Sequence, residues 1–448
     1  MALGITAQEY RRRRREVINQ LGSDSVLILP AAHEMIRNRD VTYPFRQDSD
    51  FIWLTGFPEP DAIAVITPGQ RGAEYTLFCR PRDPERERWD GERIGIDGAV
   101  AQYQADVAYS LAELEQKIPD LLSNRRRVFY PLAVNAEFDA QIMQWLRVVR
   151  NKARGGITAP SECVSSDRIL HELRLIKSPA ELTLMRRAAK ISALAHRTLM
   201  TTCQPGSTEA VLETAFICTC AQHGARHQAY SPIVAGGERA CILHSVSNDA
   251  PLHDGDLVLI DAGAEFNGYA SDITRTFPVN GRFNFAQCQL YELVLNAQAA
   301  ALACAIPGQY WNAPHEAAVK VLTRGLVKLG LLAGQSKDVP RLIKEEQYKP
   351  FYMHRTGHWL GLDVHDVGDY KPNQQWRQFT PGMVLTIEPG LYIAPDADVP
   401  MEYRGIGIRI EDDVLITAGG NEILSREVPK EVAAIETLMA QRRNHKVK

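Results

Sequence analysis

Two aspartates lie inside apolar, strand-like segments, where charged side chains are unusual. Asp261 ends one apolar run, and Asp272 lies eleven residues later in a second one. Between them, Asn267-Gly268 is a strong signal for a two-residue hairpin turn, because both residues accept a positive φ. With that turn, Asp261 lies opposite Thr274, and the two carboxylates share one face of the hairpin at a separation of about 5–8 Å.

Two carboxylates at this separation repel each other unless a positive charge lies between them. One explanation is an ion pair in which Arg275 or another cation neutralises one of the aspartates. The other is a bound metal ion. The pattern favours the metal ion, because further residues of ligand type occur later in the chain.

Three histidines, His354, His358 and His365, occur within twelve residues of an apolar stretch that is punctuated by glycines. A single histidine in such a stretch is usually a hydrogen-bonded core residue. Three together favour a site, since neutral imidazole is a standard ligand for divalent metals and can also form hydrogen bonds around one.

Two glutamates also lie at the ends of strand-like segments. Glu388 follows an apolar run and precedes Pro-Gly, and Glu411 ends the alternating segment 405–411. In that segment Gly407, Arg409 and Glu411 share one face, and the isoleucines share the other. A surface ion pair between Arg409 and Glu411 is the simpler interpretation, but it does not explain the acids in the other strand-like segments.

Together these residues give four carboxylates and one imidazole, which is too acidic for a structural zinc site built from Cys and His. Two divalent cations balance the four negative charges and leave room for a bridging hydroxide. Oxygen-rich ligation favours manganese, with cobalt or zinc as alternatives. A pair of metals activates water at neutral pH and polarises a carbonyl group, so the pattern indicates a hydrolase. The expected ligands are Asp261, Asp272, His358, Glu388 and Glu411.

The order and context of these five residues resemble those of the pita-bread metallopeptidases, and most closely the aminopeptidase P family within them. That family releases an N-terminal residue that precedes proline; prolidase and methionine aminopeptidase are more distant matches. The resemblance spans nearly the whole chain and is densest over residues 177–416. It rests on the segments LVLIDAGAEFNGYASDITRTFPV, HWLGLDVHDVG, GMVLTIEPGLYI and GIGIRIEDDVLIT.

The resemblance implies a role for each candidate residue. Asp261 would bind one metal, Asp272 and Glu411 would bridge both, and His358 and Glu388 would complete the shells, with Glu388 as proton shuttle. The remaining candidates are His244, His354 and His365 around the substrate carbonyl and proline, Arg409 beside Glu411, and the pocket and lid aromatics Tyr230 and Trp89. For Tyr230 and Trp89, ordinary packing is the alternative.

The resemblance also implies an α+β fold, with a ribonuclease-H-like α/β domain over residues 1–176 and a pita-bread catalytic domain over 177–448. Ser178-Pro-Ala-Glu181 predicts the first helix of the second domain through a capping box. Further helices are expected over 207–223, 285–304 and 314–329, and strands within 230–246, 256–278, 351–360, 382–393 and 404–416. In the first domain the patterns predict strands near 26–30, 51–54, 62–67 and 75–79, and helices over 108–117 and 136–149.

Composition excludes several classes of protein. The 448 residues are 45% apolar and 23% charged, with a net charge of −3, so no overall field favours nucleic acid or an anionic membrane. The arginine run 11–15 follows a helix start capped by Thr6, and we expect a solvated helix face there rather than a nucleic-acid site. Without a signal-peptide pattern or a long apolar run, and with eight dispersed cysteines, a cytoplasmic location is expected.

Other interpretations remain open. A prolidase restricted to dipeptides has the same chemistry, whereas a metal-free or creatinase-like relative would not need four clustered acids. A nucleotide-binding oxidoreductase lacks its glycine-rich fingerprint. The resemblance implies a homotetramer, or a dimer, in which Trp89 of a neighbouring copy covers the cleft. One departure concerns subsite preference: the family pattern His-Gly-x-Ser-His reads His354-Arg-Thr-Gly-His358 here, so that Arg355 borders the cleft.

Overall fold

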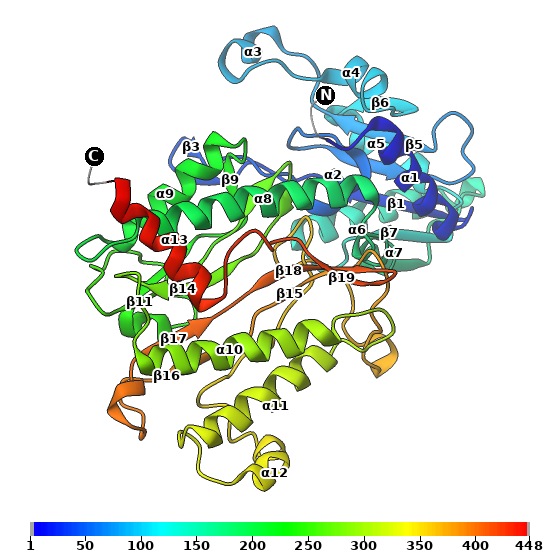
Figure 1. Ribbon diagram of the computed structural model, residues 1–448. Helices are drawn as coiled ribbons and strands as arrows, with labels where there is room; N and C mark the ends of the chain where they lie inside the picture. The colour runs from blue at the N-terminus through cyan, green and yellow to red at the C-terminus, as the bar shows by residue number, and fades with distance from the viewer. Residues whose placement is uncertain (1–3, 446–448) are drawn as a thin grey trace. The chain divides into compact units, whose positions relative to one another are not determined.

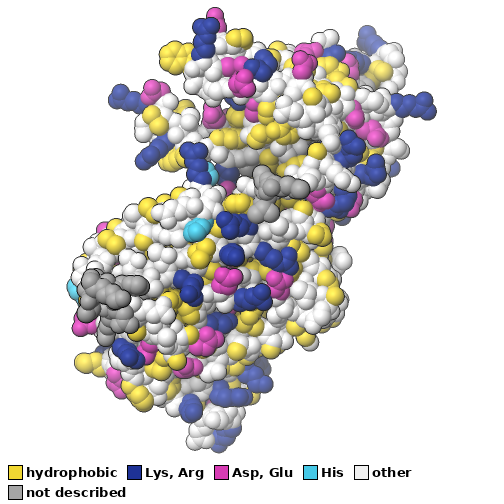
Figure 2. Space-filling view, turned by 45° about the horizontal axis from the view of Figure 1, so that its top comes forward, with side chains coloured by type: hydrophobic (Ala, Val, Ile, Leu, Met, Phe, Trp, Pro, Cys, Tyr) yellow, Lys and Arg dark blue, Asp and Glu magenta, His cyan; other side chains and the backbone are white. Residues whose placement is uncertain are grey.

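The computed structural model describes residues 4–445. Contacts divide the chain into an N-terminal unit, Ala2–Arg174, and a C-terminal unit, Leu175–Lys448. Among the described residues, no helix is long and apolar enough to cross a membrane. On the face seen in Figure 2, positive and negative side chains are interspersed, as the small net charge predicts.

The N-terminal unit is built on a six-stranded mixed sheet with the order β6-β5-β4-β1-β7-β8. The central strand β1 pairs antiparallel with β4 and parallel with β7. The strands of this unit are β1 (Ser25–Pro30), β2 (Ile36–Asn38), β3 (Val41–Thr42), β4 (Ile63–Ile66), β5 (Tyr75–Cys79), β6 (Val107–Ser110), β7 (Arg127–Tyr130) and β8 (Glu162–Ser165). Its helices are α1 (Ala7–Leu21), α2 (Ser49–Thr55), α3 (Pro84–Asp90), α4 (Gly95–Ala101), α5 (Leu114–Leu122), α6 (Ala136–Arg150) and α7 (Asp167–Leu175), which runs into the next unit.

Two predictions for this unit are wrong. Residues 51–54 lie in α2 and not in a strand, because Asp48 caps a helix there by accepting a hydrogen bond from the Phe51 backbone N–H. A four-residue apolar run fits a short buried helix as well as a strand. The helix expected over 108–117 begins later: residues 107–110 form β6, and the capping box of Ser110 starts the helical turn that follows.

The arginine run also differs from expectation. Thr6 caps α1 as predicted, but Arg13 and Arg14 are buried rather than solvated. Arg13 lies 5.0 Å from the centre of the Trp53 ring and donates to its carbonyl, and Arg14 lies 4.4 Å from the centre of the Tyr75 ring. Guanidinium groups stack well on aromatic rings, so two of the five arginines pack the unit instead of facing a ligand.

The C-terminal unit places several small sheets between α8 on one side and α10 and α11 on the other (Figure 1). The strand orders are β10-β11-β14, β13-β12-β9, β15-β18-β19 and β16-β17. The helices are α8 (Pro179–Thr202), α9 (Glu209–Gln222), α10 (Phe285–Cys304), α11 (Ala313–Lys328), α12 (Val339–Lys344) and α13 (Val432–His445). The strands are β9 (His227–Gln228), β10 (Ile233–Gly236), β11 (Leu257–Asp261), β12 (Ala264–Phe266), β13 (Tyr269–Ala270), β14 (Thr274–Pro278), β15 (Val384–Ile387), β16 (Gly390–Ile393), β17 (Ile406–Arg409), β18 (Asp412–Thr417) and β19 (Gly420–Ile423).

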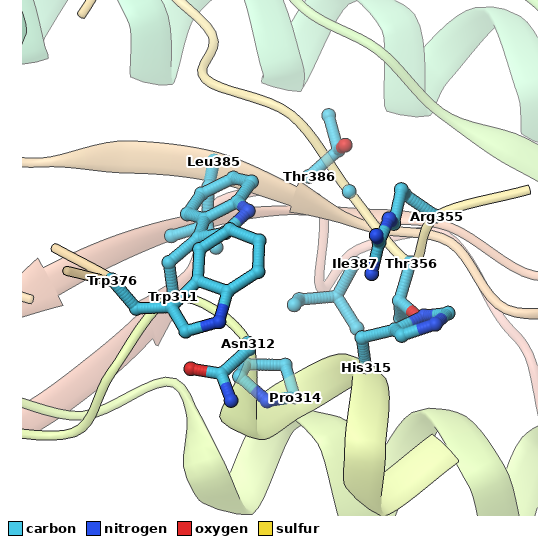
Figure 3. Close-up of a pocket in the computed structure, with 11 residues that line it drawn as sticks. Trp311, Asn312, Pro314, His315, Arg355, Thr356, Trp376, Leu385, Thr386 and Ile387 are labelled. Atoms are coloured by element: carbon cyan, nitrogen blue, oxygen red, sulfur yellow. The ribbon is translucent and has the colours of Figure 1, made fainter. Parts of the chain in front are cut away.

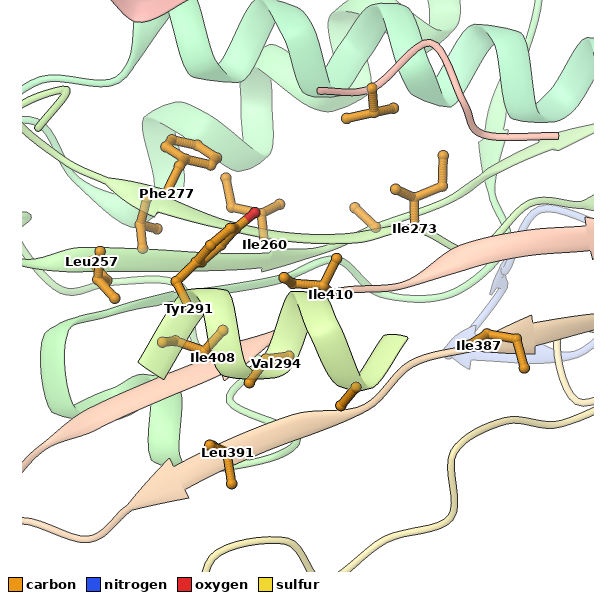
Figure 4. Packing of buried hydrophobic residues seen from close by; sticks show 14 of the residues in the cluster. Leu257, Ile260, Ile273, Phe277, Tyr291, Val294, Ile387, Leu391, Ile408 and Ile410 are labelled. Carbon is orange, nitrogen blue, oxygen red and sulfur yellow. The ribbon is translucent and has the colours of Figure 1, made fainter. Parts of the chain in front are cut away.

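The predicted capping box begins α8: the Ser178 side chain accepts from the Glu181 backbone, and Glu181 accepts from the Ser178 backbone. The hydrophobic core of the C-terminal unit lies between its helices and its strands. There Tyr291 and Val294 of α10 pack with Ile408 and Ile410 (Figure 4). Because side chains alternate along a strand, the burial of these isoleucines turns the neighbouring polar residues toward the opposite face.

The opposite face of β17 is tightly packed at one position. Gly407 lies against the 3₁₀ turn η3 (Gly237–Cys241), and a Cβ atom at residue 407 would overlap the carbonyl oxygen of Ala240. Glycine is therefore required here by the close approach of two backbones. His244 follows this turn by three residues.

The prediction of a strand within 351–360 is wrong. The segment runs beside β15, and the Thr386 N–H donates to the His358 carbonyl, but only an isolated bridge at Trp359 forms. Gly357 explains the irregularity, because a Cβ atom there would overlap the Thr386 carbonyl oxygen. The backbone thus approaches β15 too closely for a regular ladder, and the histidines are carried by an irregular segment.

Arg275 and Asp412 form an ion pair that is fully buried in this unit, at 2.7 Å. Asp412 also binds the ammonium group of Lys430 at 2.6 Å. Burial alone raises the pKa of Asp412, but the two cations outweigh it and lower the pKa to about 2. Arg275 is therefore committed to a structural carboxylate.

Replacing Asp412 with Asn should destabilise the protein strongly, because it leaves the buried Arg275 charge without its partner. We expect the free energy of unfolding, measured by urea denaturation, to fall by about 3–5 kcal/mol. The matched change Glu422→Gln, in an exposed pair with Arg186, should cost less than about 1 kcal/mol. Because the pKa of Asp412 is lowered on folding, its contribution is present above about pH 4 and is lost as the pH falls toward 2. Equal losses in both variants would contradict this interpretation.

Candidate metal centre

A cleft of about 500 Å³ in the C-terminal unit brings together the five predicted ligands. It is also lined by all but one of the other candidate residues. Those lining it are Tyr230, His244, Asp261, Asp272, His354, His358, His365, Glu388, Arg409 and Glu411. The remaining candidate, Trp89, lies in α3 of the N-terminal unit, with 85% of its surface exposed.

The predicted hairpin places the two aspartates. Strands β11 and β14 pair antiparallel with Asp261 opposite Thr274, and Phe266 lies opposite Tyr269 at the turn, so the predicted register is confirmed. Between these pairs the two strands touch: a Cβ atom at Gly263 would overlap the carbonyl oxygen of Ser271.

Asp272, His358 and Glu411 form a compact group of metal-ligand type, with one ligand atom of each within 4.8 Å of the others. His358 Nε2 lies 3.3 Å from an Asp272 carboxylate oxygen and 3.8 Å from Glu388. The other ring nitrogen, Nδ1, lies 2.9 Å from the Trp359 carbonyl oxygen, which fixes the orientation of the ring. A backbone partner of this kind is typical of metal-binding histidines.

Arg409 is the cation that pairs with one of the aspartates, and Arg275 is not. The Arg409 guanidinium donates to Asp261 at 2.6 Å and to the Thr274 hydroxyl at 3.2 Å. That hydroxyl in turn donates to Glu411 at 2.7 Å. Arg409 therefore neutralises Asp261 and orients Glu411 through Thr274. One guanidinium still leaves three of the four carboxylates in the cleft to be balanced.

Tyr230 lies deeper in the centre than a pocket aromatic would. Its hydroxyl contacts both Asp261 and Asp272. A phenol has one proton to donate, so it cannot satisfy two ionised carboxylates at once. The second contact is favourable only when a proton or a cation lies among these oxygens.

The pKa values of the acids show the same shortage of positive charge. Burial raises the pKa of Glu388 to about 7 and, together with Asp272, the pKa of Glu411 well above its usual range. Burial lowers the pKa of His358, but the hydrogen bond with Asp272 outweighs it and raises the pKa to about 9. Protons thus take up the charge that divalent cations would balance, and the donor set of carboxylate oxygens with one imidazole nitrogen fits such cations.

A second group of ligand type lies in the N-terminal unit: Asp50, Asp167 and His171. Here Arg174 pairs with Asp50 at 2.6 Å, so the buried carboxylate is already neutralised. Asp167 is half-buried, and 41% of its side chain is accessible to solvent. The group therefore does not require a metal ion.

Two buried residues behind the cleft wall, which hold its side chains in place, were not predicted from the sequence. Besides Thr274, the Tyr392 hydroxyl contacts His354 Nε2 at 2.9 Å and accepts from Arg409 at 3.0 Å. Tyr392 lies opposite Gly407 in the β16–β17 pair. Only this register reveals its position, because a tyrosine in an apolar strand is otherwise typical of a core.

Comparisons with known proteins agree with this geometry. Residues 183–418 match the model of metallopeptidase family M24, and residues 10–130 match the aminopeptidase P N-terminal domain. The chain belongs to metallopeptidase family M24. It is a hydrolase, and the predicted α+β fold with a C-terminal pita-bread domain is confirmed.

Relatives in this family match over almost their whole length. A Xaa-Pro aminopeptidase of Haemophilus influenzae is 45% identical over 97% of this chain and 98% of its own. The structure of Pseudomonas aeruginosa aminopeptidase PepP has a TM-score of 0.97 at 52% identity, covering 99% of this chain and 100% of that one. Zinc-substituted Escherichia coli aminopeptidase P in complex with product has a TM-score of 0.94 at 44% identity, covering 98% and 99%. The predicted resemblance to aminopeptidase P is confirmed, and prolidase is not favoured.

Metal binding should release protons, because a pKa of about 7 for Glu388 and of about 9 for His358 keeps both groups at least partly protonated near pH 7 in the metal-free protein. Calorimetric titration of metal-free protein with Mn²⁺, in two buffers that differ in ionisation enthalpy, should show net proton release. The affinity should fall as the pH is lowered from about 8 to about 6. A pH-independent affinity would contradict the assignment, and Asp272→Asn should weaken binding at every pH.

Proposed function

We propose that the C-terminal unit, taken as a catalytic domain over residues 177–448 that follows an N-terminal domain over 1–176, removes the N-terminal residue from peptides whose second residue is proline. The observation that carries this proposal is the convergence of four carboxylates and one imidazole in a single cleft of a family M24 chain. The relatives of similar length that carry the name Xaa-Pro aminopeptidase support the choice of substrate.

Each ligand takes the part that the resemblance implies. Asp261 would bind one divalent cation, Asp272 and Glu411 would bridge two, and His358 and Glu388 would complete the coordination. When bound, the cations supply an activated water molecule and polarise the scissile carbonyl group. Oxygen-rich ligation supports manganese as the physiological metal, with cobalt and zinc as alternatives.

Glu388 is the proposed proton shuttle. Cleavage of an amide requires a proton to be taken from water and delivered to the leaving nitrogen, which is the proline nitrogen here. A carboxylate that lines the cleft among the other ligands can take up this proton and pass it on. His354 Nδ1 lies 3.8 Å from Glu388, and the contact of His354 with Tyr392 holds the imidazole beside this carboxylate.

The other histidines of the cleft are proposed to hold the substrate. His365 meets His358 edge to face, with ring centres 4.3 Å apart, and burial lowers the pKa of His365. A neutral imidazole can donate to a substrate carbonyl without repelling the cations. His244 lines the same cleft. Because a prolyl amide has no N–H, its pocket can select the ring by shape without offering an acceptor.

An assay of Ala-Pro-Ala cleavage tests this function directly. We expect release of free alanine, loss of turnover after removal of metal with a chelator, and recovery on addition of Mn²⁺. Glu388→Gln should lower kcat by about 10²- to 10⁴-fold, as expected for a lost general acid–base. Cleavage of the dipeptide Ala-Pro without cleavage of the tripeptide Ala-Pro-Ala would indicate a prolidase. Full turnover by metal-free protein would refute the metal-dependent mechanism.

We further propose a homotetramer, with a dimer as the alternative, in which Trp89 of one copy contacts the cleft region of another. Large apolar side chains that gather on a surface commonly mark an interface. Besides Trp89, the β2–β3 hairpin and its flanks expose Met35, Ile36 and Tyr43.

A cytoplasmic location is proposed because free thiols, as in Cys79 and Cys203, are stable in a reducing compartment.

Replacing Trp89 with Ala should weaken assembly without unfolding the chain, because 85% of this side chain is exposed in the single chain. Light scattering during size-exclusion chromatography should show a lower mass for Trp89→Ala than for the unaltered protein at low micromolar concentration. The thermal unfolding of the N-terminal unit should be nearly unchanged. An unaltered protein that is monomeric under these conditions would overturn the proposed assembly.

A further inference from the structure

Arg355 is an exposed cation at the edge of the cleft. It lines the cleft beside His354 and His358, and it also lines a smaller adjoining pocket with His315 and Trp376. Figure 3 shows its side chain beside this pocket, and its guanidinium carbon lies 5.9 Å from the centre of the Trp376 ring. Within residues 4–445, no carboxylate forms an ion pair with Arg355.

The backbone that carries Arg355 is held from both sides. The Arg355 carbonyl oxygen lies 2.7 Å from His354 Nδ1. The next residue, Thr356, is buried, and its hydroxyl contacts His315 Nδ1 at 2.8 Å and the Tyr352 hydroxyl at 2.6 Å. A guanidinium on a fixed backbone loses less freedom when it binds a ligand than one on a mobile loop.

The two arginines of the cleft differ in what they contact. Arg409 is buried, and its charge is offset by Asp261 at 2.6 Å. Arg355 is exposed, and its charge is not offset by any carboxylate of the described chain. A planar guanidinium in this state can form two parallel hydrogen bonds with a carboxylate, and the Trp376 ring, whose centre is 5.9 Å away, offers no acceptor that would occupy its N–H groups.

The charge of a peptide substrate determines which part can approach Arg355. The free amino end is positive near neutral pH and is repelled by a guanidinium. A negative group on the far side of the scissile bond is attracted. Such a group is either an acidic side chain after the proline or the free carboxy terminus of a short peptide.

We propose that Arg355 is a specificity-determining residue that binds a carboxylate carried by the substrate on the C-terminal side of the proline. This inference rests on the proposed Xaa-Pro aminopeptidase function. It makes peptides with a negative charge next to the proline the preferred substrate class.

Matched peptides test the preference. Ala-Pro-Asp-amide against Ala-Pro-Asn-amide changes only the side-chain charge, and Ala-Pro-Ala against its amide changes only the terminal charge. We expect the charged member of at least one pair to have a kcat/KM higher by about three- to tenfold, mainly through KM. The pair with the larger ratio identifies the source of the carboxylate. Because the contact is exposed, the ratio should fall when NaCl is added.

Variants connect the preference to this side chain. Arg355→Gln should reduce the ratio to about one, and Arg355→Lys should give an intermediate ratio, because it keeps the charge but loses the paired donors. Lys371→Gln is the matched control: Lys371 lies 3.8 Å from the centre of the same Trp376 ring but does not line the cleft, so it should keep the original ratio. If Arg355→Gln does not fold, the salt dependence of the unaltered enzyme still decides the outcome.

Several results would overturn the inference. They are equal cleavage of charged and neutral peptides by the unaltered enzyme, a ratio that is retained in Arg355→Gln or insensitive to NaCl, and a preference for an acidic first residue in Asp-Pro-Ala-amide over Asn-Pro-Ala-amide. If neutral Ala-Pro-Asn-amide is cleaved readily but without charge preference, only this inference fails. If no peptide with proline second is cleaved, the proposed function itself fails.

Discussion

Four carboxylates share one buried cleft, and the need to offset their charge organises the C-terminal unit. Arg409 offsets Asp261 and His358 offsets Asp272, each at hydrogen-bond or near hydrogen-bond distance. Among the described residues, none forms an equivalent hydrogen bond with the Glu388 side chain, whose nearest histidine nitrogens lie 3.8 Å away, and burial raises its pKa. Such a cluster would be costly in a core that had no use for cations, because burying like charges together destabilises a fold. The site is therefore a source of strain that metal binding relieves, and the remainder of the unit must be stable enough to hold it.

That stability comes from neighbouring pairs that are kept apart from the site. Arg275 and Asp412 lie next in sequence to Thr274 and Glu411, yet they point into the opposite side of the strands and neutralise each other there. The alternation of strand side chains separates the two networks. One face carries acids available for ligation, and the other carries a closed ion pair.

Much of this centre could be predicted from the sequence, because an acid inside an apolar strand is a local anomaly that needs a reason. The turn at Asn267-Gly268 determines the hairpin register, and that register is enough to place Asp261 and Asp272 on one face. Non-local facts could not be predicted. Tyr392 reaches His354 only through the pairing of two strands, and the irregular path of the chain at Gly357 depends on how closely β15 approaches. In the N-terminal unit, the burial of Arg13 depends on aromatic rings far away in sequence, and the apolar run 51–54 was too short to distinguish strand from helix.

Because Gly407 has no side chain, strand β17 and the turn before His244 can pack directly against each other. Strand β17 ends in Arg409, and the turn pressed against Gly407 leads into His244. Any larger residue at 407 would push that turn outward and displace the imidazole, although Gly407 is not among the residues that line the cleft. The strand and the turn can therefore change in shape only together. A substitution at Gly407 would impair the site in the same way as a substitution of His244, although the His244 side chain would still be present.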